Sequence, residues 1–352
     1  MSVIDLRSDT VTKPTPAMME AMARAELGDD GRGDDPTVKK LEAMAADRMG
    51  KAAGLFVPSG TMSNQIAILA HSGRVGEVVG EATSHIFRSE MGGVATIAGL
   101  FHRALPGSRG AMDLDALADV LKPPALAPHH LGTALVCMET THNAAGGAVL
   151  PLAHMASVKR MASAKGVPVH VDGARVFNAA IAQGVDARTI AAHADSITFC
   201  LSKGLSAPVG SVLTGSAEFI TRARGFRRML GGNMRQAGLL AACGIVALEQ
   251  NVDRLRDDHD NARALARGLE AIDPRFCSAK DIETNIVMVR APGGNAAQWV
   301  ERLAAHNVLA LAASRDVIRL VTHREISGTD VERAIAAFAA VHAAQTKTTN
   351  AA

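Results

Sequence analysis

The hydrophobic pattern alternates between two periods over the first two-thirds of the chain. Short runs rich in apolar and β-branched residues, each a predicted strand, lie at 53–57, 133–138, 167–172, 196–200 and 209–214. Longer stretches between them, such as 151–165, have the spacing typical of helices. Strands that alternate with helices predict an α/β fold around a large, mainly parallel sheet.

The pattern changes after residue 236. A long helical stretch covers 236–269, and the runs 285–289 and 317–321 are predicted strands among further helical segments. We therefore predict a large α/β domain over 14–248, and a smaller α+β domain formed by 249–345 with the N-terminal segment 1–13. The polar residues 346–352 are expected to form a flexible tail.

Composition narrows the class of protein. The chain has 352 residues, of which 48% are apolar and 20% charged, a balance typical of globular proteins. The net charge of +2 favours neither a nucleic-acid nor a membrane partner. We expect no secretory signal and no transmembrane helix, because no long apolar run is present. The four cysteines are far apart, which predicts neither a metal site nor a disulfide framework and suits the cytoplasm.

Two residues at predicted strand ends carry candidate chemistry. Lys203 follows the run 196–200, and Asp172 ends the run 167–172. Ligands of open α/β sheets bind at this edge. Burial favours the neutral, nucleophilic amine of a lysine, and a buried carboxylate keeps a pyridine-type nitrogen protonated. Each residue has an ordinary alternative, since a lone lysine is weak evidence and an aspartate often caps a helix.

A third element, Ser59-Gly60-Thr61, precedes a predicted helix and offers small side chains and free amides to a phosphate group. By itself it is an ordinary helix start. His85 follows another predicted strand and is a candidate to stack on a cofactor ring or act as a base, although a lone histidine is usually structural.

Taken together, these motifs identify a resemblance that spans about residues 5–336. The chain resembles the low-specificity L-threonine aldolase family, in the β-eliminating-lyase-like branch of the fold-type I pyridoxal phosphate-dependent enzymes. Six blocks carry it in order: 5–15 (DLRSDTVTKPT), 56–62 (FVPSGTM), 141–147 (THNAAGG), 170–175 (HVDGAR), 199–211 (FCLSKGLSAPVGS) and 234–238 (MRQAG).

The resemblance implies a role for each matching residue. Lys203 is implied to hold pyridoxal phosphate as a Schiff base, and His85 and His142 are the candidate bases. The implied cofactor-binding residues are Lys203, Asp172 at the ring nitrogen, Arg175 near the ring oxygen, His85 on the ring, Ser59, Gly60, Thr61 and Ser202 near the phosphate, and Arg228 across a subunit interface. The implied substrate-binding residues are Ser8, Arg175 and Arg319 at the carboxylate and His142 at the hydroxyl. Arg32, which does not match the family pattern, is added to them as a hypothesis.

The implied reaction is retro-aldol cleavage of an L-β-hydroxy-α-amino acid, such as L-threonine or L-allo-threonine, to glycine and an aldehyde. The resemblance also implies a homodimer or homotetramer with active sites at the subunit interface. We expect no metal. Two alternatives stay open: another fold-type I enzyme, such as a β-eliminating lyase or an aminotransferase, and a binding protein that keeps the fold without catalysis.

The chain departs from the family pattern at several positions. Arg32, in 32–36 (RGDDP), stands where the family usually has tyrosine, Arg228 where it has lysine, and Asn233 where glycine is common. Our hypothesis is that Arg32 favours a substrate with an acidic side chain, such as a 3-hydroxyaspartate-like compound. The alternative is that Arg32 pairs with Asp34 or Asp35 in a solvated turn, or contacts the cofactor phosphate. Residues 122–130 are expected to form an inserted loop.

Overall fold

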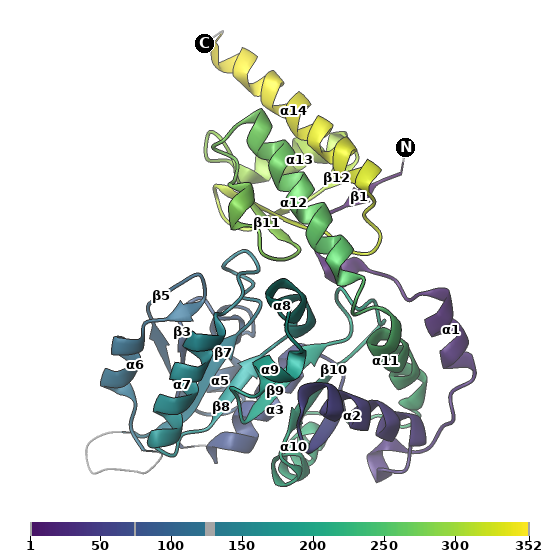
Figure 1. The fold of residues 1–352 in the computed structure, drawn as a ribbon, viewed down its shortest axis with the longest axis vertical. Coiled ribbons are helices and arrows are strands. Elements are labelled where there is room, and N and C mark those ends of the chain that lie inside the picture. Colours follow the sequence, from purple (N-terminus) through teal and green to yellow (C-terminus); the bar gives the residue numbers. More distant parts are fainter. Residues whose placement is uncertain (1, 74, 124–130, 351–352) are drawn as a thin grey trace. The chain divides into compact units, whose positions relative to one another are not determined.

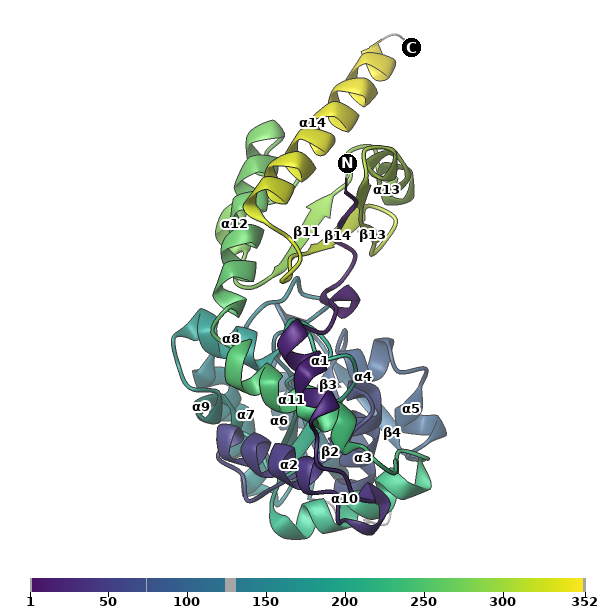
Figure 2. The ribbon, with the colours of Figure 1, turned by 90° about the vertical axis from the view of Figure 1, so that its right-hand side faces the viewer.

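The chain forms two compact units. The computed structural model describes residues 2–73, 75–123 and 131–350, so most of the loop expected at 122–130 lies outside the described residues. One unit comprises Lys13–Val252, and the other comprises Met1–Thr12 together with Asp253–Ala352 (Figures 1 and 2). The sequence analysis predicted the boundaries between these units after residues 13 and 248, close to the observed ones after 12 and 252.

A seven-stranded sheet organises the larger unit (Figure 1). The strands lie in the order β2 (Ala53–Val57), β10 (Ser211–Gly215), β9 (Ser196–Cys200), β8 (Val169–Asp172), β7 (Thr133–Glu139), β3 (Glu77–Glu81) and β4 (Phe101–Leu105). From β9 to β4 every neighbouring pair is parallel, and β10 runs antiparallel to both β9 and β2. This confirms the predicted α/β fold with a large, mainly parallel sheet.

Helices pack around this sheet. They are α1 (Pro16–Ala23), α2 (Pro36–Met49), α3 (Gly60–Ser72), α4 (His85–Arg88), α5 (Gly93–Thr96), α6 (Leu114–Val120), α7 (Leu152–Ala164), α8 (Val176–Gln183), α9 (Ala187–Ala191), α10 (Ala217–Met229) and α11 (Gly238–Gln250). Helix α3 is buried on two sides. Ile66 and Ala67 pack with β2, β10 and α10, while Ile68 and Leu69 pack toward β3 and β7. The short strands β5 (Gly107–Ser108) and β6 (Ala111–Met112) form a hairpin.

The smaller unit contains the α+β elements expected at both ends of the chain. Strands β11 (Ile286–Arg290), β14 (Val317–Val321) and β13 (Leu311–Ala312) form an antiparallel sheet, and β1 (Ile4–Asp5) pairs in parallel with β12 (Val308–Leu309). The helices are α12 (Leu255–Ile272), α13 (Ala296–Ala305) and α14 (Gly328–Asn350). Helix α14 therefore extends into the segment that the sequence predicts to be a flexible tail.

Three of the boundaries that differ from the predictions have a clear physical cause. The stretch 236–269 is two helices, because Asn251 ends α11 and its side-chain amide donates to the Leu205 carbonyl at 2.7 Å. Strand β8 starts at Val169, after Pro168, which has no N–H for the ladder. Strand β10 starts at Ser211, because Gly210 has φ +112 and no room for a Cβ beside the Phe56 ring.

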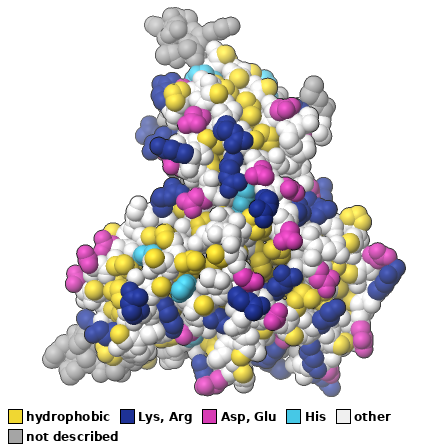
Figure 3. Space-filling model, viewed as in Figure 1, with side chains coloured by type: hydrophobic (Ala, Val, Ile, Leu, Met, Phe, Trp, Pro, Cys, Tyr) yellow, Lys and Arg dark blue, Asp and Glu magenta, His cyan; other side chains and the backbone are white. Residues whose placement is uncertain are grey.

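The mixture of basic and acidic side chains on the surface agrees with the small net charge of +2. On the face shown in Figure 3, basic and acidic side chains are interspersed, with hydrophobic side chains between them. Within the described residues, no helix is both long enough and apolar enough to cross a membrane.

An aromatic cluster stabilises the smaller unit and gives a first prediction. Trp299 packs against Phe276 at a centroid distance of 5.3 Å and against Phe338 at 6.0 Å, and all three are fully buried. Phe338→Ala should lower the free energy of unfolding of this unit by about 3–5 kcal/mol, through lost burial and the cavity left behind. Trp299 is the only tryptophan, so its fluorescence during urea unfolding measures this unit selectively.

Leu311→Ala is the matched control, because Leu311 belongs to the same unit and is 44% exposed. It should change the free energy of unfolding by less than about 1 kcal/mol. Equal losses from the two substitutions would contradict the assignment of the aromatic cluster as the core of this unit.

Candidate active site

A cavity of about 210 Å³ opens in the larger unit, where β8 ends at Asp172 and β9 ends at Cys200. Its lining residues are Ser59, Gly60, Thr61, Asn64, His85, Asp172, Ala174, Cys200, Ser202 and Lys203. Eight of these ten residues lie in the sequence blocks that carry the resemblance, and the other two are Asn64 and His85. The structure thus gathers the predicted lysine, aspartate, turn and histidine around one space.

Asp172 and Lys203 provide the opposite charges of this cavity. Asp172 is only 5% exposed, and burial by itself would raise the pKa of its carboxyl. The charges of His85 and Lys203 and a hydrogen bond from Asn64 outweigh burial, so the pKa of Asp172 is lowered overall. Its Oδ1 also accepts from the Ala174 backbone N–H at 3.1 Å. The Asp172 carboxylate is therefore held ionised next to an amine.

The start of α3 supplies a binding place for an anion. Ser59 is the N-cap of this 13-residue helix, and its Oγ accepts from the Met62 N–H at 3.2 Å. A Cβ at Gly60 would lie 2.9 Å from Cys200 Sγ, so only glycine leaves the backbone this close to β9. Free N–H groups and the helix dipole at this end of α3 attract a phosphate group.

Asn64 and Glu90 belong to the site but were missed by the sequence analysis. The Asn64 Nδ2 donates to Asp172 Oδ2 and to Glu90 Oε1, both at 2.8 Å. Glu90 Oε1 also lies 2.9 Å from His85 Nδ1, and its Oε2 accepts from Gln65 Nε2 at 2.6 Å. The sequence feature that points to them is the pair of adjacent amides at 64 and 65, directly before the apolar run 66–70.

The orientation of Asn64 is fixed from its other side by His170, which is linked through Ser196 to His71. Since Nδ2 donates to the carboxylates, Oδ1 accepts, and the His170 Nε2 at 3.1 Å is its donor. His170 Nδ1 then accepts from Ser196 Oγ at 2.8 Å, and Ser196 accepts from His71 Nε2 at 2.8 Å. Burial lowers the pKa of His170 to about 4 and that of His71 to about 3, so both rings are uncharged at neutral pH.

His85 is the histidine that reaches the cavity. It begins α4, and its backbone N–H donates to Glu139 Oε2 at 2.6 Å. The hydrogen bond to Glu90 raises the pKa of His85, and burial opposes this effect. Because Glu90 occupies Nδ1, Nε2 is the ring nitrogen left to act on a bound molecule.

His142, which the resemblance places at the substrate hydroxyl, is fully buried and does not line the cavity. Its Nε2 lies 3.1 Å from Glu81 Oε2 and 3.7 Å from Glu139 Oε2, and its Nδ1 accepts from the Ala145 N–H at 3.3 Å. In this structure His142 is thus one member of a buried acidic cluster behind His85, and its catalytic role stays a prediction.

One group of side chains, His85, Glu90 and Asp172, has the spacing of a metal site. Their possible ligand atoms lie within 4.8 Å of one another, and no other such group occurs among the described residues. The Asn64 amide donates to both of the carboxylates. An N–H donor directed at these oxygens competes with a cation for the same lone pairs, so the grouping is explained by hydrogen bonding.

The remaining predicted residues lie outside this cavity or at its border. Arg175 is buried at the start of α8, three residues after Asp172. Ser8 and Arg319 belong to the smaller unit, where Arg319 Nη1 donates to the Arg7 carbonyl at 3.4 Å. Arg32 and Arg228 line a second cavity of the larger unit, which shares no lining residue with the first.

Comparisons with known proteins give one consistent result. Residues 5–292 match the model of the family described as Beta-eliminating lyase. The chain is 41% identical over 343 residues to low-specificity L-threonine aldolase 1 of Arabidopsis thaliana, with 96% of each chain covered. It is 42% identical over 329 residues to low specificity L-threonine aldolase of Escherichia coli K12, with 92% of this chain and 95% of the relative covered.

Two solved structures show the same fold. Threonine aldolase of Leishmania major has a TM-score of 0.80 at 18% identity and covers 96% of this chain and 99% of its own. SPT with PLP has a TM-score of 0.75 at 18% identity, with 97% of this chain and 88% of its own covered. The fold is therefore that of the fold-type I pyridoxal phosphate enzymes, as the sequence predicted.

Proposed function

The chain belongs to the β-eliminating lyase family and, within it, to the low-specificity L-threonine aldolases, and we propose that it cleaves L-threonine to glycine and an aldehyde. L-Allo-threonine and other L-β-hydroxy-α-amino acids, such as phenylserine, are the further substrates proposed. The observation that carries the proposal is the cavity in which Lys203, the ionised Asp172 and the first turn of α3 face one space. The protein is thus an aldehyde-lyase acting on a small amino acid.

Pyridoxal 5′-phosphate is the cofactor, and the residues of the cavity fit it. When bound, it withdraws the electrons released as the substrate Cα–Cβ bond breaks. Asp172 would hold the proton of its ring nitrogen, because that carboxylate is buried and ionised. The amine of Lys203 would bind its aldehyde carbon. Ser59, Gly60 and Thr61, with Ser202, would bind its phosphate at the start of α3.

The two candidate bases are not equivalent in their surroundings. His85 lines the cavity with Nε2 available, whereas His142 is fully buried against Glu81 and Glu139. We therefore propose that His85 Nε2 takes the β-hydroxyl proton. Glu90 fixes the orientation of its ring, and Glu139 fixes its backbone. Arg175, Ser8 and Arg319 would bind the substrate carboxylate, as the family resemblance implies.

We also propose that the enzyme is a homodimer or homotetramer with active sites at the subunit interface, and that it is cytoplasmic. Arg228 lines a different cavity from Lys203 in the same chain, so a role beside the cofactor would require a second subunit. The four cysteines are all free thiols, which supports a reducing compartment.

Lys203→Ala tests the proposed function directly. With added pyridoxal phosphate and L-threonine, the wild type should release equimolar glycine and aldehyde. The variant should be slower by about a thousandfold or more and lack the absorbance of lysine-bound cofactor. Lys165→Ala, at an exposed lysine after α7, should behave like the wild type. Keto acid or ammonia as the main product would instead assign a β-eliminating lyase or aminotransferase.

Glu90→Gln tests the role of His85. The largest cause of the raised pKa of His85 is its hydrogen bond to Glu90, so this substitution should lower that pKa. If neutral His85 is the base, activity rises with pH as the ring loses its proton. The rising limb of the kcat profile should then move to lower pH in the variant. Glu20→Gln, in an exposed pair with Arg24, should leave the profile unchanged. An unmoved limb in Glu90→Gln would exclude His85 as the titrating base.

Mixing two inactive variants tests the shared active site. Lys203→Ala and Arg228→Gln proteins should each be impaired alone. If each site takes these two residues from different subunits, half of a statistical mixture is mixed dimer, and each mixed dimer contains one intact site. Activity should then recover to about a quarter of the wild-type value after reassociation. No recovery would show that both residues act within one subunit, and an Arg228→Gln protein that is fully active alone would show that Arg228 has no part in the site.

A further inference from the structure

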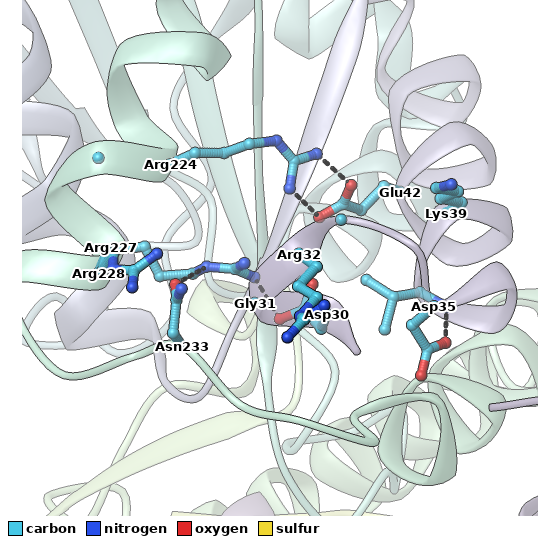
Figure 4. A pocket seen from close by; sticks show the side chains of 13 residues that line it. Asp30, Gly31, Arg32, Asp35, Lys39, Glu42, Arg224, Arg227, Arg228 and Asn233 are labelled. Atoms are coloured by element: carbon cyan, nitrogen blue, oxygen red, sulfur yellow. Dashed lines mark hydrogen bonds and ion pairs between the residues drawn. The ribbon is translucent and has the colours of Figure 1, made fainter. Parts of the chain in front are cut away.

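The second cavity of the larger unit has a volume of about 470 Å³ and an unusual charge balance. It is formed by the turn at Asp30–Arg32, the start of α2 and the end of α10 (Figure 4). Five basic side chains line it, Arg32, Lys39, Arg224, Arg227 and Arg228, against three acidic ones, Asp30, Asp35 and Glu42. The lining therefore has an excess of two positive charges.

Each of the three acidic residues has a partner within the fold. Asp30 pairs at 3.0 Å with Arg227, which is 2% exposed and also donates to the Phe56 carbonyl at 2.8 Å. Glu42 binds Arg224 and accepts from the Phe56 N–H at 2.9 Å. Asp35 caps α2. These contacts neutralise Arg224 and Arg227 and make them part of the wall (Figure 4).

The positive charges left over belong to exposed side chains at the cavity. In the part of the chain that the structure describes, neither Arg228 nor Lys39 forms an ion pair. The only ion pair of Arg32 there is a loose one, with its Nε 3.7 Å from Asp29 Oδ2, and its side chain is 79% exposed. Asp29 is already bound by Arg235 at 3.0 Å.

Asp34 and Asp35, the partners expected for Arg32 in a solvated turn, make other contacts in this structure. Asp34 Oδ1 accepts from the Asp29 N–H at 2.6 Å, and Asp35 accepts from the Val38, Gly28 and Gly238 N–H groups. In this structure Arg32 pairs with Asp29 and not with the expected Asp34 or Asp35, and its alternative contact with the cofactor phosphate stays a prediction. Its guanidinium keeps its hydrogen-bonding capacity for a ligand.

Three departures from the family pattern meet in this cavity. Arg32 precedes α2, while Arg228 in the last turn of α10 and Asn233 shortly after it lie close together in sequence, and all three line the cavity. Asn233 Oδ1 accepts from Arg227 Nε at 3.2 Å, which leaves its amide nitrogen as a further donor. Two cations and one amide donor at the same place form an environment suited to an oxyanion.

We propose that this cavity binds the side-chain carboxylate of an acidic β-hydroxy-α-amino acid, with Arg32 as the residue that selects it. The inference rests on the proposed function and on the proposed sharing of active sites between subunits. For 3-hydroxyaspartate, the Cα–Cβ bond breaks and the β-hydroxyl loses its proton. Glyoxylate leaves with the side-chain carboxylate intact, and glycine gains a proton at Cα. Arg32 touches only the spectator carboxylate, so it affects the choice of substrate and leaves the chemical step to the Lys203 cavity.

The experiment compares kcat/KM for L-3-hydroxyaspartate and L-threonine, measured as glyoxylate and acetaldehyde release by the cofactor-loaded enzyme. The ratio of the two values should fall about tenfold or more in Arg32→Gln, because a charge-assisted contact is lost. Arg32→Lys should recover part of the preference, since it keeps the charge but not the planar fork. Arg24→Gln, at an exposed arginine of the same unit, should leave the ratio unchanged.

Inhibition by L-aspartate provides a second measurement. L-Aspartate has the same two carboxylates but no β-hydroxyl, so it binds without being cleaved. Its inhibition constant against L-threonine should rise about tenfold in Arg32→Gln, while that of L-alanine should not change. An unchanged substrate ratio together with unchanged aspartate inhibition overturns the inference, even if threonine is cleaved. If the wild-type protein binds the cofactor but cleaves neither substrate, the proposed function is overturned instead.

Discussion

The Asn64 side chain lies between two buried carboxylates, those of Asp172 and Glu90, and its Nδ2 donates to both at 2.8 Å. Burial by itself would raise the pKa of the Asp172 carboxyl. The charges of His85 and Lys203 and the hydrogen bond from Asn64 outweigh burial and lower that pKa. Asp172 can then stay ionised for the cofactor while Glu90 stays available to His85. The cofactor site and the candidate base therefore depend on one neutral side chain.

That side chain is itself held by residues far from the reaction. His170 donates to Asn64 Oδ1, and Ser196 and His71 complete the chain of hydrogen bonds. Each member has a defined direction, because the low pKa values of both histidines keep their rings neutral. A network in which every donor has one acceptor permits few alternative arrangements. The core of the large sheet thus determines the geometry of the site.

The sequence predicted those parts of the site that follow from strand ends and from specific motifs. Lys203, Asp172, the 59–61 turn and His85 line one cavity because the carboxyl ends of β8 and β9 and the start of α3 meet there. Asn64 and Glu90 could not be found in this way, because neither lies at a strand end or in a motif, and Asn64 is 108 residues from Asp172 and 26 from Glu90. The burial of His142 against two glutamates and the break at Asn251 likewise depend on tertiary contacts that local periodicity does not contain.

The smaller unit is built from both ends of the chain. Strand β1 at Ile4–Asp5 pairs with β12 at Val308–Leu309, and the whole of Lys13–Val252 lies between them in sequence. During synthesis on a ribosome, β1 emerges long before β12 has been made. It therefore stays unpaired while the larger unit folds. The two units therefore mature in a fixed order. Ile4 and Leu6, both buried in the finished unit, are apolar side chains that a chaperone could protect on the nascent chain.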